Sequence, residues 1–280
     1  MQNSKNPAKV ICAISHGLYE PWLSILKDGQ QQTWLSEKFP ENFEVLHYHA
    51  TPVGRLFQLL DKLHEKIRWK NRYLASFLCL MDNLILSPLL SYIPKSQNSQ
   101  LLTSVENVLH IKFPDTYLTY RWKFLSLLKY FVYETNSEFL FITSTASYVQ
   151  PDLVLEFINK IPDNSTYAGA EPYEGADFIS GSNRIISREI AIQVLETRNK
   201  WKPGIIEDVA FTRLVKANGN QLMTFPIANI DSITSLFETP DAFIKRTYHF
   251  RLKSITGAKR NDVLIMKSLH ERVLRLKNGE

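Results

Sequence analysis

The sequence predicts an α/β fold, with a mixed, mainly parallel central sheet flanked by helices. Three observations predict it. Short apolar runs alternate with segments of helical periodicity, the chain opens with a β-α-β pattern, and 280 residues suit one enzyme-sized domain. We therefore expect one domain over residues 1–280, with a helical insertion at 54–105 and a basic C-terminal segment and helix at 240–280.

The composition is that of a globular chain, because 44% of the residues are hydrophobic and 22% are charged. Lys and Arg number 33 against 28 Asp and Glu, a net charge of +5 that suits phosphate-bearing ligands or an anionic membrane surface. No nucleic-acid-binding module is recognisable, so we expect no nucleic-acid partner. Cys12 and Cys79 have no metal-site spacing, which favours a reducing compartment. Without a signal-peptide pattern at the N-terminus, we expect a cytoplasmic protein.

The chain opens with a Rossmann-like pattern. Val10–Ser15 is predicted to be a short buried strand, Trp22–Glu37 a helix and Phe43–His49 a second strand. Two apolar strands joined by a helix are typical of a parallel sheet.

Residues 54–92 are expected to form two helical stretches, followed by a polar connector. The first stretch is an amphipathic cationic helix, and the second, from Leu74 to Ile93, is about long enough to span a bilayer. Asp82, Asn83 and Pro88 argue against a span, since each is costly in a lipid-exposed helix. Two interpretations stay open: a surface helix followed by a buried one, or a peripheral membrane contact through 59–93, on the inner face of the cell membrane.

The rest of the chain continues the alternation of helices and strands. We expect helices at 119–134, 151–161, 188–197, 207–218 and 261–277, and strands at 139–143, 166–170, 178–186 and 221–226. The strand that ends at Thr143 runs directly into small hydroxyl residues. Its end is a candidate site, because ligands of open α/β sheets bind beyond the carboxyl ends of the strands.

Glu207 and Asp208 are the most informative acids. They follow a Gly turn and two apolar residues at a predicted helix start, where free backbone N–H groups can orient carboxylates. Acids in a first turn are also common as ordinary capping residues, so this pair alone leaves both interpretations open.

Two further segments stand upstream of these acids. Asp115-Thr116-Tyr117, followed by Lys123, precedes the apolar strand, and Phe178 to Arg188 places Ser180 and Gly181 just before a helix. Together with Glu207-Asp208-Val209, and with Thr33-Trp34 near the N-terminus, these segments resemble the successive motifs of the fringe and β-1,3-galactosyltransferase-like glycosyltransferases. The resemblance is best from Asp115 to Pro226, and it implies the GT-A fold.

One motif of that family is missing. Its members carry an Asp-x-Asp-type triplet that holds a divalent cation after the apolar strand, whereas this chain reads Thr143-Ser144-Thr145-Ala146-Ser147. Hydroxyl groups and a methyl group make no site for a hard cation. We therefore expect no metal site and no cofactor, although a carboxylate outside 143–147 could still supply a divalent cation site.

Basic side chains can replace a metal, because they stabilise charge that develops on phosphate oxygens. Metal-independent GT-A enzymes of the core-2 branching type are similar in this respect. The C-terminal segment offers such a cluster, which could also be a solvated basic face. The candidate donor-binding residues are Lys123, Ser144, Thr145, His249, Arg251 and Lys253.

The resemblance implies an inverting single displacement, with Asp208 as the base and Glu207 orienting or contacting the acceptor. The candidate acceptor-binding residues are Glu171, Asp177, Ser180 and Gly181. The donor would be a nucleotide sugar of undetermined UDP or CMP type, and the acceptor a glycan or a lipid-linked glycan of bacterial surface polysaccharide or lipopolysaccharide synthesis. The alternative is a catalytically silent GT-A-like domain that binds a glycan or a partner protein.

Overall fold

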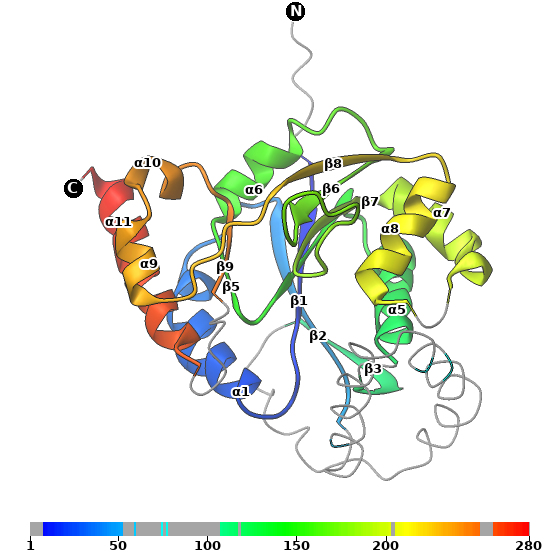
Figure 1. Cartoon of the computed structure of the whole chain (residues 1–280), viewed down its shortest axis with the longest axis horizontal. Helices are drawn as coiled ribbons and strands as arrows, with labels where there is room; N and C mark the ends of the chain where they lie inside the picture. Colours follow the sequence, from blue (N-terminus) through cyan, green and yellow to red (C-terminus); the bar gives the residue numbers. More distant parts are fainter. Residues whose placement is uncertain are drawn as a thin grey trace, which may run out of the picture.

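The computed structural model describes residues 8–52, 59, 74, 77, 107–116, 119–202, 205–252 and 260–279. Within this part of the chain, seven strands form one sheet in the order β3-β2-β1-β4-β7-β6-β8 (Figure 1). Their bounds in that order are β3 (Val108–Pro114), β2 (Phe43–Thr51), β1 (Val10–Ser15), β4 (Phe139–Ser144), β7 (Asn183–Ser187), β6 (Thr166–Glu171) and β8 (Gln221–Pro226). The predicted α/β class is confirmed.

The sheet is mainly parallel. Strand β1 pairs in parallel with β2 and β4, β2 pairs in parallel with β3, and β6 pairs in parallel with β8. Only β7 runs antiparallel to its neighbours β4 and β6. A separate two-stranded sheet joins β5 (Ser147–Val149) to β9 (His249–Arg251), which brings the C-terminal segment against the end of β4.

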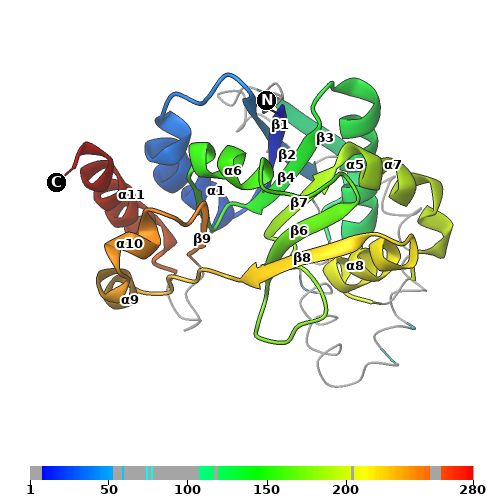
Figure 2. The same cartoon turned by 90° about the horizontal axis from the view of Figure 1, so that it is seen from above.

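Helices cover both faces of the sheet. Figures 1 and 2 place α5 (Tyr120–Glu134), α7 (Arg188–Glu196) and α8 (Glu207–Ala217) on one face. The other face carries α6 (Pro151–Ile158) and α11 (Asp262–Asn278). The short helices α1 (Trp22–Ser24), α9 (Ile233–Glu238) and α10 (Asp241–Ile244) lie on the same side as α11.

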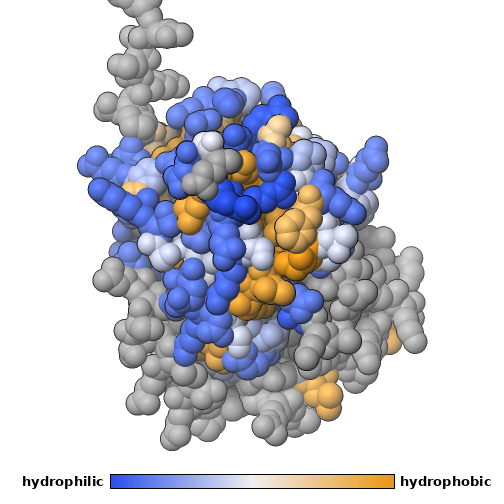
Figure 3. Space-filling model, turned by 90° about the vertical axis from the view of Figure 1, so that its left-hand side faces the viewer, coloured by the Kyte–Doolittle hydropathy of each residue, from blue (hydrophilic) through white to orange (hydrophobic). Residues whose placement is uncertain are grey.

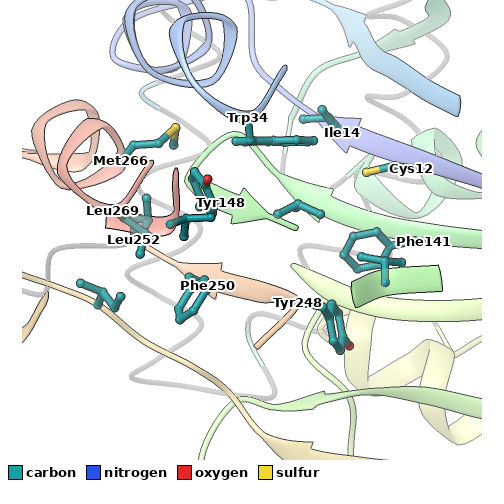
Figure 4. Packing of buried hydrophobic residues seen from close by; sticks show 14 of the residues in the cluster. Cys12, Ile14, Trp34, Phe141, Tyr148, Tyr248, Phe250, Leu252, Met266 and Leu269 are labelled. Carbon is teal, nitrogen blue, oxygen red and sulfur yellow. The ribbon is translucent and has the colours of Figure 1, made fainter. Parts of the chain in front are cut away.

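The core has two layers because successive residues of a strand point to opposite faces. In β1, Cys12 and Ile14 pack into the layer that α11 covers, whereas Ile11 and Ala13 pack into the layer under α5, α7 and α8. Figure 4 shows the first layer, in which α11 contributes Met266 and Leu269, and in which the labelled residues Trp34, Tyr148, Phe250 and Phe141 also pack. Burial on both faces explains why the central strands β1 and β4 consist mostly of consecutive apolar residues.

The prediction of one continuous helix over Trp22–Glu37 is wrong. The segment instead forms the short helix α1, a π-helical turn at Ile25–Gly29 and two 3₁₀ turns. Tertiary hydrogen bonds explain the break. The Gln30 amide donates to the backbone carbonyls of Ser144 and Ser147, and the Trp34 indole also donates to that of Ser147.

The strand expected over Phe178–Ile186 is shorter than predicted, because β7 begins only at Asn183. Residues 178–182 form a turn instead. In it, the Ile179 N–H donates to the Thr212 hydroxyl and the Ser180 N–H donates to the carbonyl of Ala170. This turn brings Gly181 beside the start of α8.

Strand β3 and the β5–β9 pair were not expected. The predicted insertion at 54–105 and its membrane contact at 59–93 fall outside the described residues, apart from three positions. In the described part of the chain, no helix combines the length and the apolar character needed to cross a bilayer.

Candidate active site

A pocket of about 350 Å³ opens where parallel strands end. From β1 the chain moves outward to β2 and β3, and it then returns to β4 on the other side of β1. Such a reversal of strand order makes a crevice at the carboxyl edge of the sheet, where ligands of open α/β folds bind. The pocket is lined by Ser15, His16, Gly17, Tyr19, Trp22, Asp115, Thr116, Tyr120, Lys123, Thr143, Ser144, Thr145, Gly181 and Ser182.

The hydroxyl residues of the turn at the end of β4 line this pocket. Ser144 and Thr145, both predicted donor-binding residues, line it. The Ser144 hydroxyl hydrogen-bonds the Ser147 hydroxyl at 3.0 Å, and Gln30 ties the backbone of the same turn. The turn offers hydroxyl groups without a carboxylate, so it does not fit a divalent cation. Among the described residues, no three His, Cys, Asp or Glu side chains are grouped to hold a metal ion.

One wall of the pocket carries an ion pair between Lys123 and Asp115. The ammonium Nζ lies 3.2 Å from the Asp115 carboxylate, and both residues line the pocket. Lys123 is 3% exposed, and its charge lies over the rings of Tyr48 and Tyr120, at 5.4 and 5.7 Å from their centroids. The structure therefore places the predicted donor-binding Lys123 in the pocket, with a carboxylate beside it.

A second ion pair lies at the start of α8. Arg184 of β7 is fully buried, and its guanidinium donates to both Glu207 oxygens at 2.8 and 3.1 Å. The guanidinium also lies 4.0 Å from the ring centroid of Phe124 and 5.4 Å from that of Phe211. Burial raises the pKa of Glu207, and Arg184 opposes that shift. Because its two oxygens are held by one guanidinium, Glu207 anchors the first turn of α8.

Asp208 has a different environment although it is the next residue. Its Oδ1 accepts a hydrogen bond from the Val209 N–H at 3.0 Å. A Cβ added to the pocket residue Gly181 would lie 3.9 Å from its Oδ2 and 3.7 Å from the Glu207 Oε2, so both carboxylates lie beside this lining residue. Burial raises the pKa of Asp208, while Arg184 and the backbone N–H groups of Val209 and Gly181 oppose that shift. A carboxylate in such a place can accept a proton from a bound hydroxyl group.

The C-terminal cluster places two of its predicted residues on β9. His249 is buried and hydrogen-bonds the Thr143 hydroxyl at 3.0 Å. Burial, together with the nearby Arg251, lowers the pKa of His249 to about 3. The imidazole is therefore neutral and does not supply the positive charge expected of it. Lys253 lies outside the described residues.

Arg251 remains as a cation near the site. It is half-buried, and its side chain has no ion-pair partner in the described ranges. Burial lowers the pKa of Arg251, the neighbouring Arg260 lowers it further, and Asp208 opposes both effects. The guanidinium stays charged because arginine is not deprotonated in proteins. Arg260 in turn pairs with Asp262 and lies 4.4 Å from the ring centroid of the pocket residue Trp22.

The four predicted acceptor-binding residues do not lie together in the structure. Gly181 lines the pocket, and the neighbouring Ser180 is buried and hydrogen-bonds the Ser182 hydroxyl at 3.0 Å. Glu171 ends β6 and accepts a hydrogen bond from the Thr224 hydroxyl, while Asp177 is exposed in the following loop. Neither of these two acids lines the pocket.

The sequence analysis did not identify the segment after β1 as part of the site. His16, Tyr19 and Trp22 line the pocket. His16 is 2% exposed, and its ring nitrogens have no hydrogen-bond partner among the described residues. Burial lowers the pKa of His16 to about 2, and His47 and His49 add to the shift. The sequence could have indicated this segment. Strand β1 was predicted correctly, and because it pairs in parallel with β4, the carboxyl ends of both strands lie at the same edge of the sheet.

The sequence matches neither the models of known protein families nor the curated proteins. Solved structures are similar in fold. One is a glycosyltransferase involved in the glycosylation of the major capsid of PBCV-1, with a TM-score of 0.47 and 12% sequence identity over 94% of this chain and 99% of that chain. Another is S. aureus TarS in complex with UDP-GlcNAc, with a TM-score of 0.42 and 11% identity over 95% of this chain and 66% of that chain. At such identities, the chemistry of the chain must be inferred from its own residues.

Proposed function

We propose that this protein is a glycosyltransferase that moves a sugar from a nucleotide-sugar donor to a glycan or lipid-linked acceptor. The main support for the proposal is that segments far apart in the sequence lie around one pocket. Asp115 and Lys123, the hydroxyl turn at Ser144, and Gly181 with Asp208 are separate in sequence, yet they surround the crevice at the carboxyl edge of the sheet. Apart from the hydroxyl turn, which stands where that family has its acidic triplet, these are the segments in which the sequence resembles fringe-like glycosyltransferases.

In the proposed reaction, Asp208 is the base of an inverting displacement. The oxygen of an acceptor hydroxyl group attacks the anomeric carbon of the donor, and its proton passes to the Asp208 carboxylate. The bond from the anomeric carbon to the phosphate oxygen breaks, and the nucleoside diphosphate leaves with the electron pair. Burial supports this role for Asp208, because it raises the pKa of the carboxyl group toward the range of an effective base.

We further propose that cations in place of a metal stabilise the leaving diphosphate. Arg251 has no carboxylate partner among the described residues, and it interacts electrostatically with Asp208. Ser144 and Thr145 can donate hydroxyl hydrogen bonds to phosphate oxygens. Tyr19 and Trp22, which also line the pocket, provide aromatic rings against which the donor nucleotide can stack.

We place the reaction at the cytoplasmic face of a bacterial membrane, in the synthesis of a surface polysaccharide or lipopolysaccharide. The support is the basic amphipathic pattern that the sequence shows before the apolar stretch at 74–93. A lipid-linked acceptor would present its sugar to an enzyme held at that surface.

The test is a panel of nucleotide sugars in thermal-shift and donor-hydrolysis assays, with and without a chelator. We expect one class of nucleoside diphosphate to raise the melting temperature, and the matching nucleotide sugar to be hydrolysed equally with chelator present. Asp208→Asn should abolish the hydrolysis and keep the thermal shift. Asp152→Asn is the matched control, since this exposed carboxylate pairs loosely with Lys277 and does not line the pocket.

Two results would contradict the proposal. If no nucleotide changes the melting temperature and Asp208→Asn changes no activity, the catalytically silent domain that binds a glycan or a partner protein becomes the better account. The altered turn at Thr143–Ser147 favours that alternative. If turnover requires a divalent cation, the metal-independent form is wrong, and the carboxylate of Asp115 becomes the first candidate ligand in the pocket.

A further inference from the structure

A layer of helices at the C-terminal end exposes large apolar side chains. Helices α9, α10 and α11 lie on the left-hand side of Figure 1. Figure 3 views the molecule from that side and shows orange apolar residues gathered among blue hydrophilic ones. Phe237 of α9 is 72% exposed, Phe243 of α10 is 43% exposed and Leu264 of α11 is 57% exposed. Several large apolar groups exposed on one layer mark an interaction surface more often than isolated ones do.

The fold holds this layer in place rather than leaving it as a loose tail. Arg272 of α11 donates hydrogen bonds to the carbonyls of Leu236 and Thr239 and to the Asp241 carboxylate, which joins the turn between α9 and α10 to α11. Ser232 and Ser235 form a capping box at the start of α9. The buried residues of the same helices, such as Leu236, anchor them in the core. Phe237 and Phe243 are therefore held outward from a fixed support.

The charges around these apolar groups are mostly positive. The exposed cations of the layer are Lys245, Arg246, Lys267, Arg275 and Lys277. The first four of them have no carboxylate partner within the described residues. Two of its acids, Asp241 and Asp262, are neutralised by Arg272 and Arg260, which leaves Glu238 and Glu271 as the exposed acids without an ion pair. The layer thus presents a net positive surface.

We propose that the layer of α9, α10 and α11 binds the surface of an anionic membrane. Phenylalanine side chains enter the boundary between head groups and acyl chains, while Lys and Arg side chains attract the anionic head groups. A bilayer surface can make both the apolar and the electrostatic contacts at once, and it requires no complementary shape. The inference does not depend on the glycosyltransferase proposal, and it concerns a different part of the chain from the contact expected at 59–93.

The test is co-sedimentation of the full-length protein with vesicles of phosphatidylglycerol and phosphatidylcholine, compared with vesicles of phosphatidylcholine alone. We expect binding to the anionic vesicles that weakens with salt. Lys245→Glu with Arg246→Glu should weaken binding by at least about 20-fold, because each cation near an anionic surface contributes to binding. Phe237→Ser with Phe243→Ser should weaken it by roughly tenfold.

Matched controls lie elsewhere on the surface. Tyr133→Ser removes an aromatic side chain of similar exposure from α5, and Lys200→Glu with Lys202→Glu reverses two exposed cations near α8. Both should bind vesicles like the wild type. All of these positions are exposed, so circular dichroism should show unchanged folding.

The proposal is overturned if the wild type does not bind anionic vesicles, or if the α9–α10 variants bind them with the same affinity as the wild type. If those variants instead alter the sedimentation of the protein alone and leave vesicle binding intact, the layer is an interface with a second copy of the chain.

Discussion

Two buried ion pairs lie at the pocket, but only one of them consists of residues that line it. On the wall made by β3 and α5, Lys123 and Asp115 both line the pocket. Where β7 meets α8, neither Arg184 nor Glu207 is a lining residue, and the guanidinium donates from its planar fork to both carboxylate oxygens. The first pair can exchange its contacts for those of a ligand, whereas the second holds a helix in place.

This difference assigns separate roles to two adjacent acids. Glu207 and Asp208 read alike in the sequence, and both are candidate catalytic residues there. In the fold, both carboxylates lie beside Gly181. Glu207 is paired with Arg184, whereas Asp208 accepts a hydrogen bond from the Val209 N–H and has no ion-pair partner among the described residues. Neighbouring carboxyl groups in different surroundings commonly take different parts in one reaction.

The largest expected effect separates these two acids. Asp208→Asn should lower kcat for sugar transfer by roughly 10³-fold and leave the affinity for the nucleoside diphosphate unchanged, because only the proton acceptor is removed. Glu207→Gln, which keeps the shape and one hydrogen-bond acceptor, should lower kcat by no more than about tenfold. Steady-state kinetics on both purified variants provide the measurement. Equal losses would remove the distinction between the two acids.

The next effect concerns stability. Arg184→Met should lower the free energy of unfolding by about 3 kcal/mol, because it leaves the Glu207 carboxylate buried without its partner. Adding Glu207→Leu in the same chain should restore most of that loss. Urea denaturation of the wild type and of the two variants measures both changes. If Arg184→Met unfolds like the wild type, Arg184 does not anchor α8.

A smaller effect follows from the buried histidines beside the Lys123 wall. Burial lowers the pKa of His47 to about 4, from 6.5 in an unfolded chain. As the pH falls through this window, the unfolded chain takes up the proton first, so stability is full above about pH 6.5 and declines toward pH 4. Between pH 7 and pH 5 the wild type should therefore lose about 2 kcal/mol more stability than His47→Gln. Urea denaturation at the two pH values tests this difference, and parallel losses would show that His47 takes up its proton over the same pH range in the folded and the unfolded chain.

The smallest effect concerns the ion pair that faces the pocket. Lys123→Met should weaken nucleoside diphosphate binding about tenfold, which corresponds to about 1.4 kcal/mol, because it removes a positive charge from the pocket wall. Isothermal titration calorimetry measures the affinity, and Lys216→Met, whose ammonium group donates to the Asp177 carbonyl outside the pocket, is the control. Unchanged affinity would mean that Lys123 is as structural as Arg184.

The sequence predicted those elements whose signals are local. Strand β1 has the expected bounds, and α7 begins at Arg188 as expected, where the Ser187 hydroxyl accepts a hydrogen bond from the Ile190 N–H. The segment after α1 could not be predicted in this way. Gln30 and Trp34 read as positions in a helix, but their hydrogen bonds to a turn more than 100 residues away decide the local backbone.

The candidate site was predictable to a similar degree. Motif spacing indicated Lys123, Ser144, Gly181 and Asp208, which all lie at the pocket or on its border. The charge of His249 could not be foreseen, because its neutral state follows from burial against Thr143. The separate role of Glu207 depends in the same way on Arg184, whose position on the neighbouring strand only the fold reveals.

A crystal structure with a bound nucleoside diphosphate, grown in the presence of a chelator, tests the central claim most directly. The account predicts the diphosphate between the Ser144–Thr145 turn and Arg251, and the nucleoside toward His16 and Trp22, with Asp208 facing the space left for the sugar. A diphosphate bound outside this pocket, or bound only when a divalent cation is added back, would contradict it.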